Sequence, residues 1–165
     1  DIGSAIAKRA QVSKLKVVYH NRHQRADDAA LNVTYLSQEE LLATSDFVLV
    51  AVTLNPSTKG MMNAAAFAKM KPGACFINIS RGGVVDTDAL YDALKSGQLA
   101  YAALDVTDPE PLPGDHKLLT LNNITITPHI ASYTNETRDA MAMLTVDNIL
   151  AALQGQEMPA EVKIK

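Results

Sequence analysis

Short apolar segments that alternate with helical segments most restrict the fold of this chain. Residues 47–52 read Phe-Val-Leu-Val-Ala-Val, and residues 74–79 and 101–106 are nearly as apolar. Strands that are apolar on both faces and joined by helices are typical of parallel sheets in α/β proteins. We therefore predict an α/β fold with a doubly wound parallel sheet, and we expect its strands to be buried on both faces.

Turn and capping residues divide the rest of the chain into helices, strands and loops. Strands are predicted at residues 16–20, 33–35, 47–52, 74–79, 101–106 and 124–126, and helices at residues 4–13, 63–70, 86–96 and 134–153. Ser37 and Glu40 have the spacing of a capping box, which predicts another helix start. We expect Asp86 to cap a helix that Gly97 ends. Residues 108–114 hold three prolines and are predicted to be an ordered loop or a rigid extended segment.

Composition excludes several classes of protein. The chain is 47% hydrophobic and 20% charged, as in a globular protein, and its net charge of −3 argues against nucleic acid or an anionic membrane as the main partner. A single cysteine, Cys75, allows no internal disulfide, so we expect a cytoplasmic protein. The histidines show no metal-ligand spacing, and no metal site is predicted. No apolar run is long enough to span a bilayer.

The chain opens on Asp1 and directly enters a helical pattern, so we expect a fragment whose N-terminal part is missing. Ile2 and Gly3 precede the helix, and a short strand follows it. This spacing fits the last glycine of a dinucleotide-binding fingerprint, the glycine that lets the helix pack closely against a strand. The first strand of the sheet would then lie upstream of Asp1. A glycine before a helix is also an ordinary turn residue, and that alternative stays open.

The loop after the strand at residues 16–20 contains Asn21, Arg22 and Arg25. NAD-binding proteins with the dinucleotide-binding fingerprint usually carry an acidic residue in this loop, and it contacts the ribose hydroxyls. A neutral asparagine beside guanidinium groups would instead attract a 2′-phosphate. The loop therefore predicts a preference for NADP (NADPH) over NAD, and the alternative is a solvated, mildly basic loop.

Arg81 follows an apolar strand and precedes Gly82 and Gly83, at the sheet edge where α/β proteins bind ligands. The run Asn-Ile-Ser-Arg-Gly at residues 78–82 resembles the hallmark of the D-isomer-specific 2-hydroxyacid dehydrogenases, Asn-x-Ser/Ala-Arg-Gly. Asp-Val-Thr-Asp-Pro-Glu-Pro-Leu-Pro at residues 105–113 and Thr-Pro-His-Ile-Ala-Ser at residues 127–132 extend the likeness. Within the family the chain is most similar to reductases of glyoxylate and hydroxypyruvate.

The resemblance implies three catalytic residues. Arg81 matches the arginine that binds the carboxylate and carbonyl oxygen of a 2-keto acid, for which its forked guanidinium is suited. His129 matches the acid/base that protonates the carbonyl oxygen, since imidazole titrates near neutral pH. Glu110 matches the carboxylate that pairs with this histidine and fixes its tautomer. Taken one at a time, these residues would more often be an ion-pair member, a structural loop residue and a solvated acid.

The resemblance also implies contacts to substrate and cofactor. Arg81, His129 and Ser132 are the expected substrate contacts. Ala131 stands where relatives often have glycine, and its methyl group would stiffen the loop or crowd the cofactor. The residues expected to bind the cofactor are Ile2, Gly3, Asn21, Arg22, Arg25, Thr53, Ile79, Asp105 and Ala131.

The resemblance implies an oxidoreductase that transfers a hydride from NADPH to a small 2-keto acid. Residues 1–133 would form an incomplete Rossmann-like dinucleotide-binding domain. Residues 134–165 would form a helix and tail that return to a substrate domain, and the full-length protein would be a homodimer. Two alternatives remain: a nucleotide-sensing scaffold like the C-terminal-binding-protein corepressors, and an inactive, unstable fragment of the enzyme.

Overall fold

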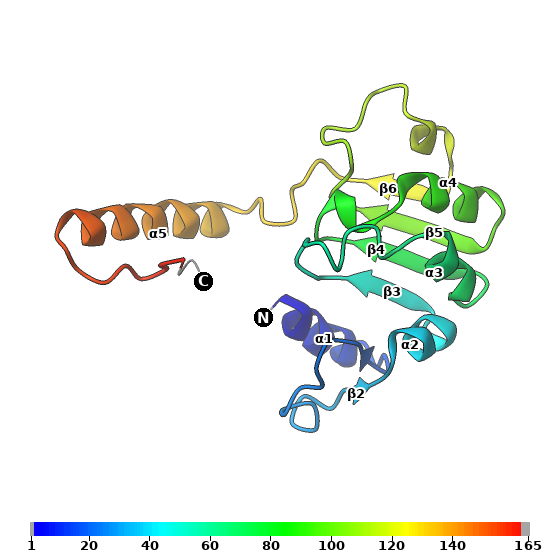
Figure 1. Cartoon of the computed structure of the whole chain (residues 1–165), viewed down its shortest axis with the longest axis horizontal. Coiled ribbons are helices and arrows are strands. Elements are labelled where there is room, and N and C mark those ends of the chain that lie inside the picture. The colour runs from blue at the N-terminus through cyan, green and yellow to red at the C-terminus, as the bar shows by residue number, and fades with distance from the viewer. Residues whose placement is uncertain (1, 163–165) are drawn as a thin grey trace. The chain divides into compact units, whose positions relative to one another are not determined.

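The computed structural model describes residues 2–162, which divide into two compact units (Figure 1). The first unit ends at Pro128 and the second begins at His129. The domain boundary predicted after residue 133 lies a few residues further along the chain. The assignment of the second unit to a substrate domain stays a prediction.

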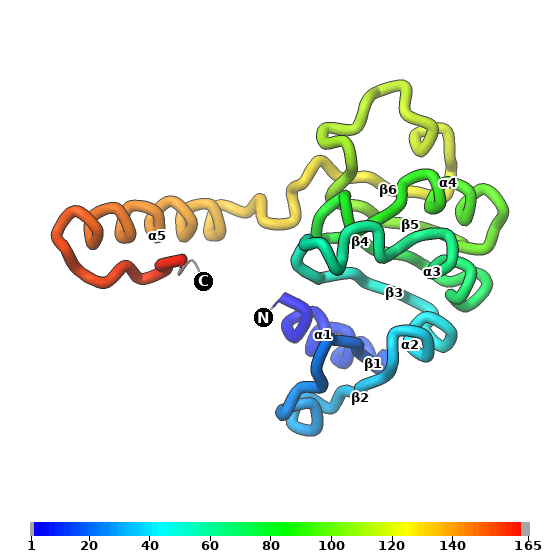
Figure 2. The backbone as a smooth tube through the Cα atoms, viewed as in Figure 1, coloured from blue at the N-terminus to red at the C-terminus, as the bar shows by residue number. Residues whose placement is uncertain are grey.

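The first unit contains a parallel sheet of four strands in the order β3-β4-β5-β6. These strands are β3 (Phe47–Val50), β4 (Ala74–Asn78), β5 (Leu99–Leu104) and β6 (Ile124–Ile126). A second parallel pair, β1 (Val18–Tyr19) and β2 (Thr34–Tyr35), lies on the β3 side of the sheet, as the backbone trace in Figure 2 shows. The predicted α/β class and parallel sheet are confirmed.

Residues 2–162 also form five α-helices, two of which, α2 and α4, begin at the predicted caps. They are α1 (Ile2–Val12), α2 (Gln38–Thr44), α3 (Ala64–Lys69), α4 (Thr87–Lys95) and α5 (Asn135–Leu153), with short 3₁₀ turns η1 (Gly82–Val84) and η2 (Lys117–Thr120). Ser37 and Glu40 form the predicted capping box of α2. Asp86 caps α4, and Gly97 follows this helix with a φ of 79°, which glycine adopts without strain.

The core lies between the sheet and the helices α3 and α4. Phe67 of α3 meets Phe76 of β4 edge to face, with 5.2 Å between ring centroids, and Leu90 of α4 is fully buried beside them. Burial alternates along β4, so that Phe76 is buried whereas Cys75 and Ile77 are half-buried. The expectation that the strands are buried on both faces is therefore wrong for this unit, because α3 and α4 cover only one face.

Strand β5 begins at Leu99, two residues earlier than the apolar run indicated. The reason lies in the turn before it. Gly97 ends the preceding helix, and the carbonyl of Gln98 accepts a hydrogen bond of 2.9 Å from the Gly73 amide. The chain thus joins the sheet at once and places Leu99 in the core.

The second unit consists mainly of α5, which Thr134 caps through a 3.2 Å bond from the Thr137 amide. Many of its apolar side chains are exposed within the unit: Met141, Met143, Leu144, Val146, Ile149, Leu150 and Leu153. Of the helices in residues 2–162, none is both long and apolar enough to cross a membrane.

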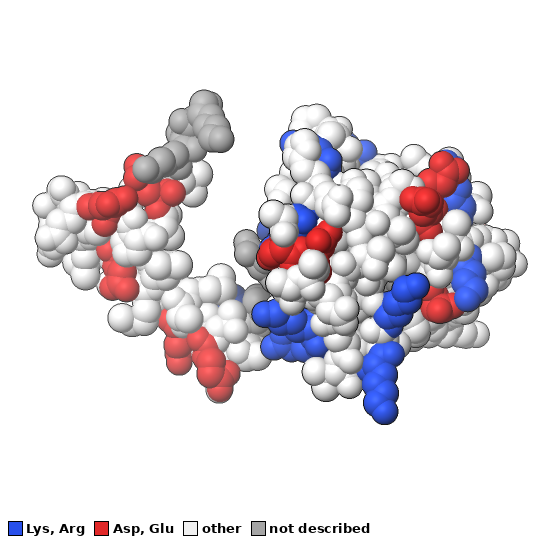
Figure 3. All heavy atoms as spheres, turned by 90° about the horizontal axis from the view of Figure 1, so that it is seen from below, with Lys and Arg blue, Asp and Glu red and all other residues white. Residues whose placement is uncertain are grey.

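Acidic and basic side chains both appear on the face shown in Figure 3, and neither sign covers it continuously.

The cap of α4 gives a test of this fold. Asp86 Oδ1 accepts bonds from the amides of Asp88 and Ala89, at 3.1 and 3.0 Å. We expect Asp86→Ala to lower the free energy of unfolding of the full-length protein by about 1 kcal/mol, measured by urea titration. Asp86→Asn keeps the acceptor and is the matched control. Equal losses in the two variants would contradict the capping role.

Candidate active site

The turn that carries Arg81 is organised by a buried asparagine. Asn78, the last residue of β4, is only 1% exposed. Its Oδ1 accepts bonds from the amide and the hydroxyl of Ser80, both at 3.0 Å, and its Nδ2 donates to the Arg81 carbonyl at 3.0 Å. The polar atoms of the turn are thus satisfied by one side chain, which fixes the backbone at Arg81.

Arg81 lies in extended backbone immediately before η1, with its side chain exposed. Its Nη1 donates to the carbonyl of Ser80 at 2.7 Å. Gly82 follows as the first residue of η1 and is buried. The exposed guanidinium therefore stands near the carboxyl end of a central strand, the edge where parallel sheets bind ligands.

Glu110 lies in the proline-rich loop that follows β5. Its Oε2 accepts a 3.3 Å bond from the Thr107 amide, and the Thr107 hydroxyl donates to the Pro109 carbonyl at 2.9 Å. The peptide bonds before Pro109 and Pro111 are cis. The segment is an ordered loop, as predicted, and it presents the Glu110 carboxylate on the surface of the first unit.

Asp105 and Ile79 meet at a hollow over the carboxyl ends of β4, β5 and β6. The hollow measures about 120 Å³ and is lined by Ile77, Ile79, Ala103, Leu104, Asp105, Thr125 and Thr127. Asp105 is 7% exposed, and the Thr127 hydroxyl donates to its Oδ1 at 2.5 Å. A mostly apolar lining with one carboxylate suits a flat ring that carries a hydrogen-bond donor.

Thr53 follows β3, which pairs directly with β4, so it lies near the same edge of the sheet. Its side chain is exposed, and its carbonyl accepts a 2.7 Å bond from the Thr58 hydroxyl. This bond closes the turn between β3 and α3. Thr53 therefore joins Ile79, Arg81 and Asp105 at one edge, as expected for residues around a shared ligand.

The loop predicted to select NADP follows β1. Arg25 is paired with Asp27 by two bonds of 2.7 Å, and these hydrogen bonds raise the pKa of Arg25 and lower that of Asp27. Asn21 and Arg22 are exposed. Within residues 2–162, Arg22 makes no ion pair, so its guanidinium is the more available of the two.

Ile2 and Gly3 lie in the first turn of α1, so the helix begins two residues before the predicted start. A Cβ added to Gly3 would meet no heavy atom of the described chain within 4 Å. The predicted close packing of a strand against this glycine lies outside the described residues and stays a prediction.

His129, Ala131 and Ser132 belong to the turn that opens the second unit. His129 has a φ of 54°, a left-handed conformation that strains a residue with a side chain and that occurs often at functional sites. The Ser132 carbonyl accepts a 3.0 Å bond from the Thr134 amide, which joins the turn to the cap of α5. The convergence of His129 with Arg81 and Glu110 stays a prediction.

Asn78, Gly82 and Thr107 belong to the runs that resemble the family, but sequence reasoning assigned them no supporting role. A signal for Asn78 was present, because an asparagine inside the apolar run Ala-Cys-Phe-Ile-Asn-Ile is a buried polar group that needs partners. For Gly82 the signal was its place directly after Arg81. Thr107 lies in the matching run at residues 105–113, but its supporting role depends on which segments meet in the fold.

The parallel sheet, with an arginine and a carboxylate-lined hollow at its carboxyl edge, defines a dinucleotide-binding α/β domain. Residues 1–131 match the family described as D-isomer specific 2-hydroxyacid dehydrogenase, NAD binding domain. The chain belongs to this family.

Known relatives agree with this assignment. The chain is 50% identical to the human glyoxylate reductase/hydroxypyruvate reductase over 165 residues, and it spans about half of that protein's length. A crystal structure of a protein from Thermus thermophilus matches with a TM-score of 0.93 and 46% identity, over 98% of this chain and 50% of that one. A family member from Xanthobacter autotrophicus, crystallised with NADPH and MES, matches with a TM-score of 0.83 and 35% identity, over 98% of this chain and 66% of that one.

The bond between Thr127 and Asp105 predicts a measurable cost of its removal. Thr127→Val leaves a buried carboxylate oxygen without this donor, and we expect the free energy of unfolding of the full-length protein to fall by about 1.5–3 kcal/mol. Thr127→Ser keeps the hydroxyl and is the matched control. Chemical denaturation of the three proteins checks the prediction, and a Val variant as stable as the Ser variant would disprove it.

Proposed function

We propose that this chain is the nucleotide-binding part of an oxidoreductase that reduces a small 2-keto acid, such as glyoxylate or hydroxypyruvate, to the 2-hydroxy acid. The observation that carries the proposal is the exposed guanidinium of Arg81 at the same sheet edge as the Asp105 hollow. Membership of the family and the names of the similar reductases support the substrate class.

In this proposal the residues of the chain orient the substrate and move the proton. Arg81 binds the carboxylate and polarises the carbonyl of the keto acid through its two-pronged guanidinium. His129 in its protonated form delivers a proton to the carbonyl oxygen and becomes neutral, and Glu110 orients the imidazole ring for this transfer. Ser132 lies in the turn after His129 and contacts the substrate.

The residues around the hollow fit a nicotinamide. Asp105 is the carboxylate that would accept a bond from a carboxamide, with Ile79 in the same hollow and Thr53 after the neighbouring strand β3 at the same edge of the sheet. Ile2, Gly3 and Ala131 complete the proposed cofactor contacts. A bound nicotinamide supplies the hydride, and the protein supplies orientation and polarity.

NADP is the preferred cofactor in this proposal. Asn21 carries no charge to repel a 2′-phosphate, and Arg22 is an available guanidinium beside it. Arg25 contributes less while it is paired with Asp27. The relative crystallised with NADPH is consistent with this choice.

The proposal extends to the whole protein. The exposed apolar side chains of α5 support its assignment to a substrate domain, since the free energy falls when another surface covers apolar side chains and removes them from water. We further propose a homodimer in the cytoplasm, which the resemblance to the family implies.

Reduction of a keto acid by the full-length protein tests the activity. We expect NADPH absorbance to fall when glyoxylate or hydroxypyruvate is added, and His129→Ala to lower kcat by about 100-fold or more because the proton donor is lost. Nucleotide binding without turnover in the wild-type protein would favour the scaffold alternative. Near-normal turnover in His129→Ala would refute the role of the histidine.

Cofactor choice is tested at Arg22. We expect Arg22→Ala to raise the KM for NADPH by about tenfold, because a charge-assisted phosphate contact is lost, and to leave the KM for NADH unchanged. Asp27→Asn releases the Arg25 guanidinium and is expected to lower the KM for NADPH. Steady-state kinetics with both cofactors checks these values, and equal effects of Arg22→Ala on the two cofactors would rule out the phosphate contact.

A further inference from the structure

We infer that Gly82 is a positioning residue, which holds the Arg81 turn and the Glu110 loop at a fixed separation through main-chain contact with Thr107. The inference rests on the proposed function, since it concerns the placement of two groups that act in that reaction. Neither Gly82 nor Thr107 would touch the substrate in this view. They act through the residues that do.

The contact at Gly82 leaves no room for a side chain. A Cβ built on Gly82 would overlap the carbonyl carbon and oxygen of Thr107, which belong to the backbone and cannot rotate away. Gly82 is buried and is not among the glycines with positive φ, so the need for glycine comes from close approach and not from backbone conformation. The two segments therefore meet backbone to backbone.

On one side of this contact lies the turn of Arg81. Asn78 binds Ser80 and the Arg81 carbonyl, and Gly82 is the next residue along the chain. A displacement of Gly82 must therefore move Arg81 or break the bonds of Asn78. Because Asn78 is buried, its broken bonds would not be replaced by water.

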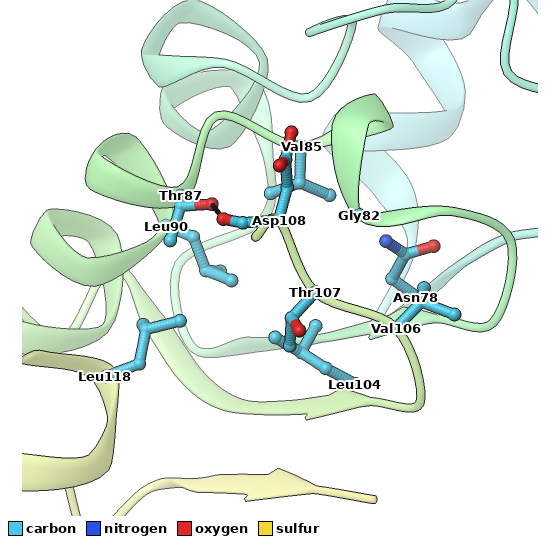
Figure 4. A pocket seen from close by; sticks show the side chains of 10 residues that line it. All are labelled: Asn78, Gly82, Val85, Thr87, Leu90, Leu104, Val106, Thr107, Asp108 and Leu118. Atoms are coloured by element: carbon cyan, nitrogen blue, oxygen red, sulfur yellow. Dashed lines mark hydrogen bonds between the residues drawn. The ribbon is translucent and has the colours of Figure 1, made fainter. Parts of the chain in front are cut away.

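On the other side lies the loop of Glu110. Thr107 donates two hydrogen bonds within this loop. Its amide donates to the Glu110 carboxylate, and its hydroxyl donates to the Pro109 carbonyl. The Thr87 hydroxyl adds a 3.4 Å bond to the Asp108 carbonyl. Figure 4 shows Asn78, Gly82, Thr87 and Thr107 around one small hollow, with the dashed Thr87–Asp108 bond.

These contacts form a continuous path from Arg81 to Glu110 within the first unit. Gly82 joins Arg81 to Thr107, and Thr107 joins Gly82 to Glu110. In the proposed reaction Arg81 orients the keto acid and Glu110 orients the imidazole, so their separation sets the alignment of substrate and proton donor. The proposed phosphate contacts Asn21 and Arg22 lie outside this path, whereas the proposed nicotinamide contacts Ile79 and Asp105 are close to it in sequence.

The adjacent glycine gives a matched control. A Cβ on Gly83 would approach the flexible Leu54 side chain most closely, at 3.3 Å. In the full-length protein we expect Gly82→Ala to lower kcat/KM for the keto acid by about 100-fold, as for a misplacement of about 1 Å, and to change the KM for NADPH far less, because the proposed phosphate contacts are not displaced. Gly83→Ala should stay close to wild type in all constants and in thermal unfolding.

A second pair of variants, at Thr107, tests the positioning role if Gly82→Ala does not fold. Thr107→Val keeps the shape of the side chain and removes its bond to Pro109, so kcat/KM for the keto acid should fall by much more than the KM for NADPH changes. Thr107→Ser keeps the hydroxyl and should restore kcat/KM.

Three results overturn the inference: a folded Gly82→Ala with wild-type kcat/KM, an equal loss in Gly83→Ala, or Thr107→Val kinetics identical to wild type. A wild-type protein that binds NADPH and reduces no keto acid would instead refute the proposed function.

Discussion

Parallel pairing of β3, β4, β5 and β6 is the constraint on which the candidate site depends. Because all four strands run the same way, the segments that leave them emerge at one edge, and residues far apart in sequence become neighbours. The sheet can hold this arrangement because Phe67, Phe76 and Leu90 fill one face of it. Asn78 then ends the central strand with a polar group whose bonds are all made inside the protein.

Much of this architecture was predictable from local sequence. Strand β6 lies where the apolar run placed it, at Ile124–Ile126, and Asp86 and the Ser37–Glu40 box cap helices as predicted. Capping and turn formation depend on residues within a few positions of one another, so a single sequence contains the whole signal. The placement of Arg81 and Glu110 on loops after strands follows from the same patterns.

Other features depend on contacts between distant segments, and the sequence did not reveal them. An apolar strand shows that it prefers burial, but not which faces are covered within the first unit, as Cys75 and Ile77 illustrate. The pairing of Arg25 with Asp27 was also missed, although the two residues are close in sequence, and it matters because Asp27 competes with a phosphate for the same guanidinium. The meeting of Gly82 with Thr107 required the fold itself.

The backbone contact at Gly82 also limits how such a protein can diversify. A position that admits no side chain offers nothing for mutation to adjust, so new substrate preferences cannot arise there by gradual enlargement or polarity change. Randomised libraries that include this codon would mostly yield misaligned variants. Mutagenesis for new substrate preferences is better directed at neighbouring residues with exposed side chains, such as Leu54, which lies next to Gly83.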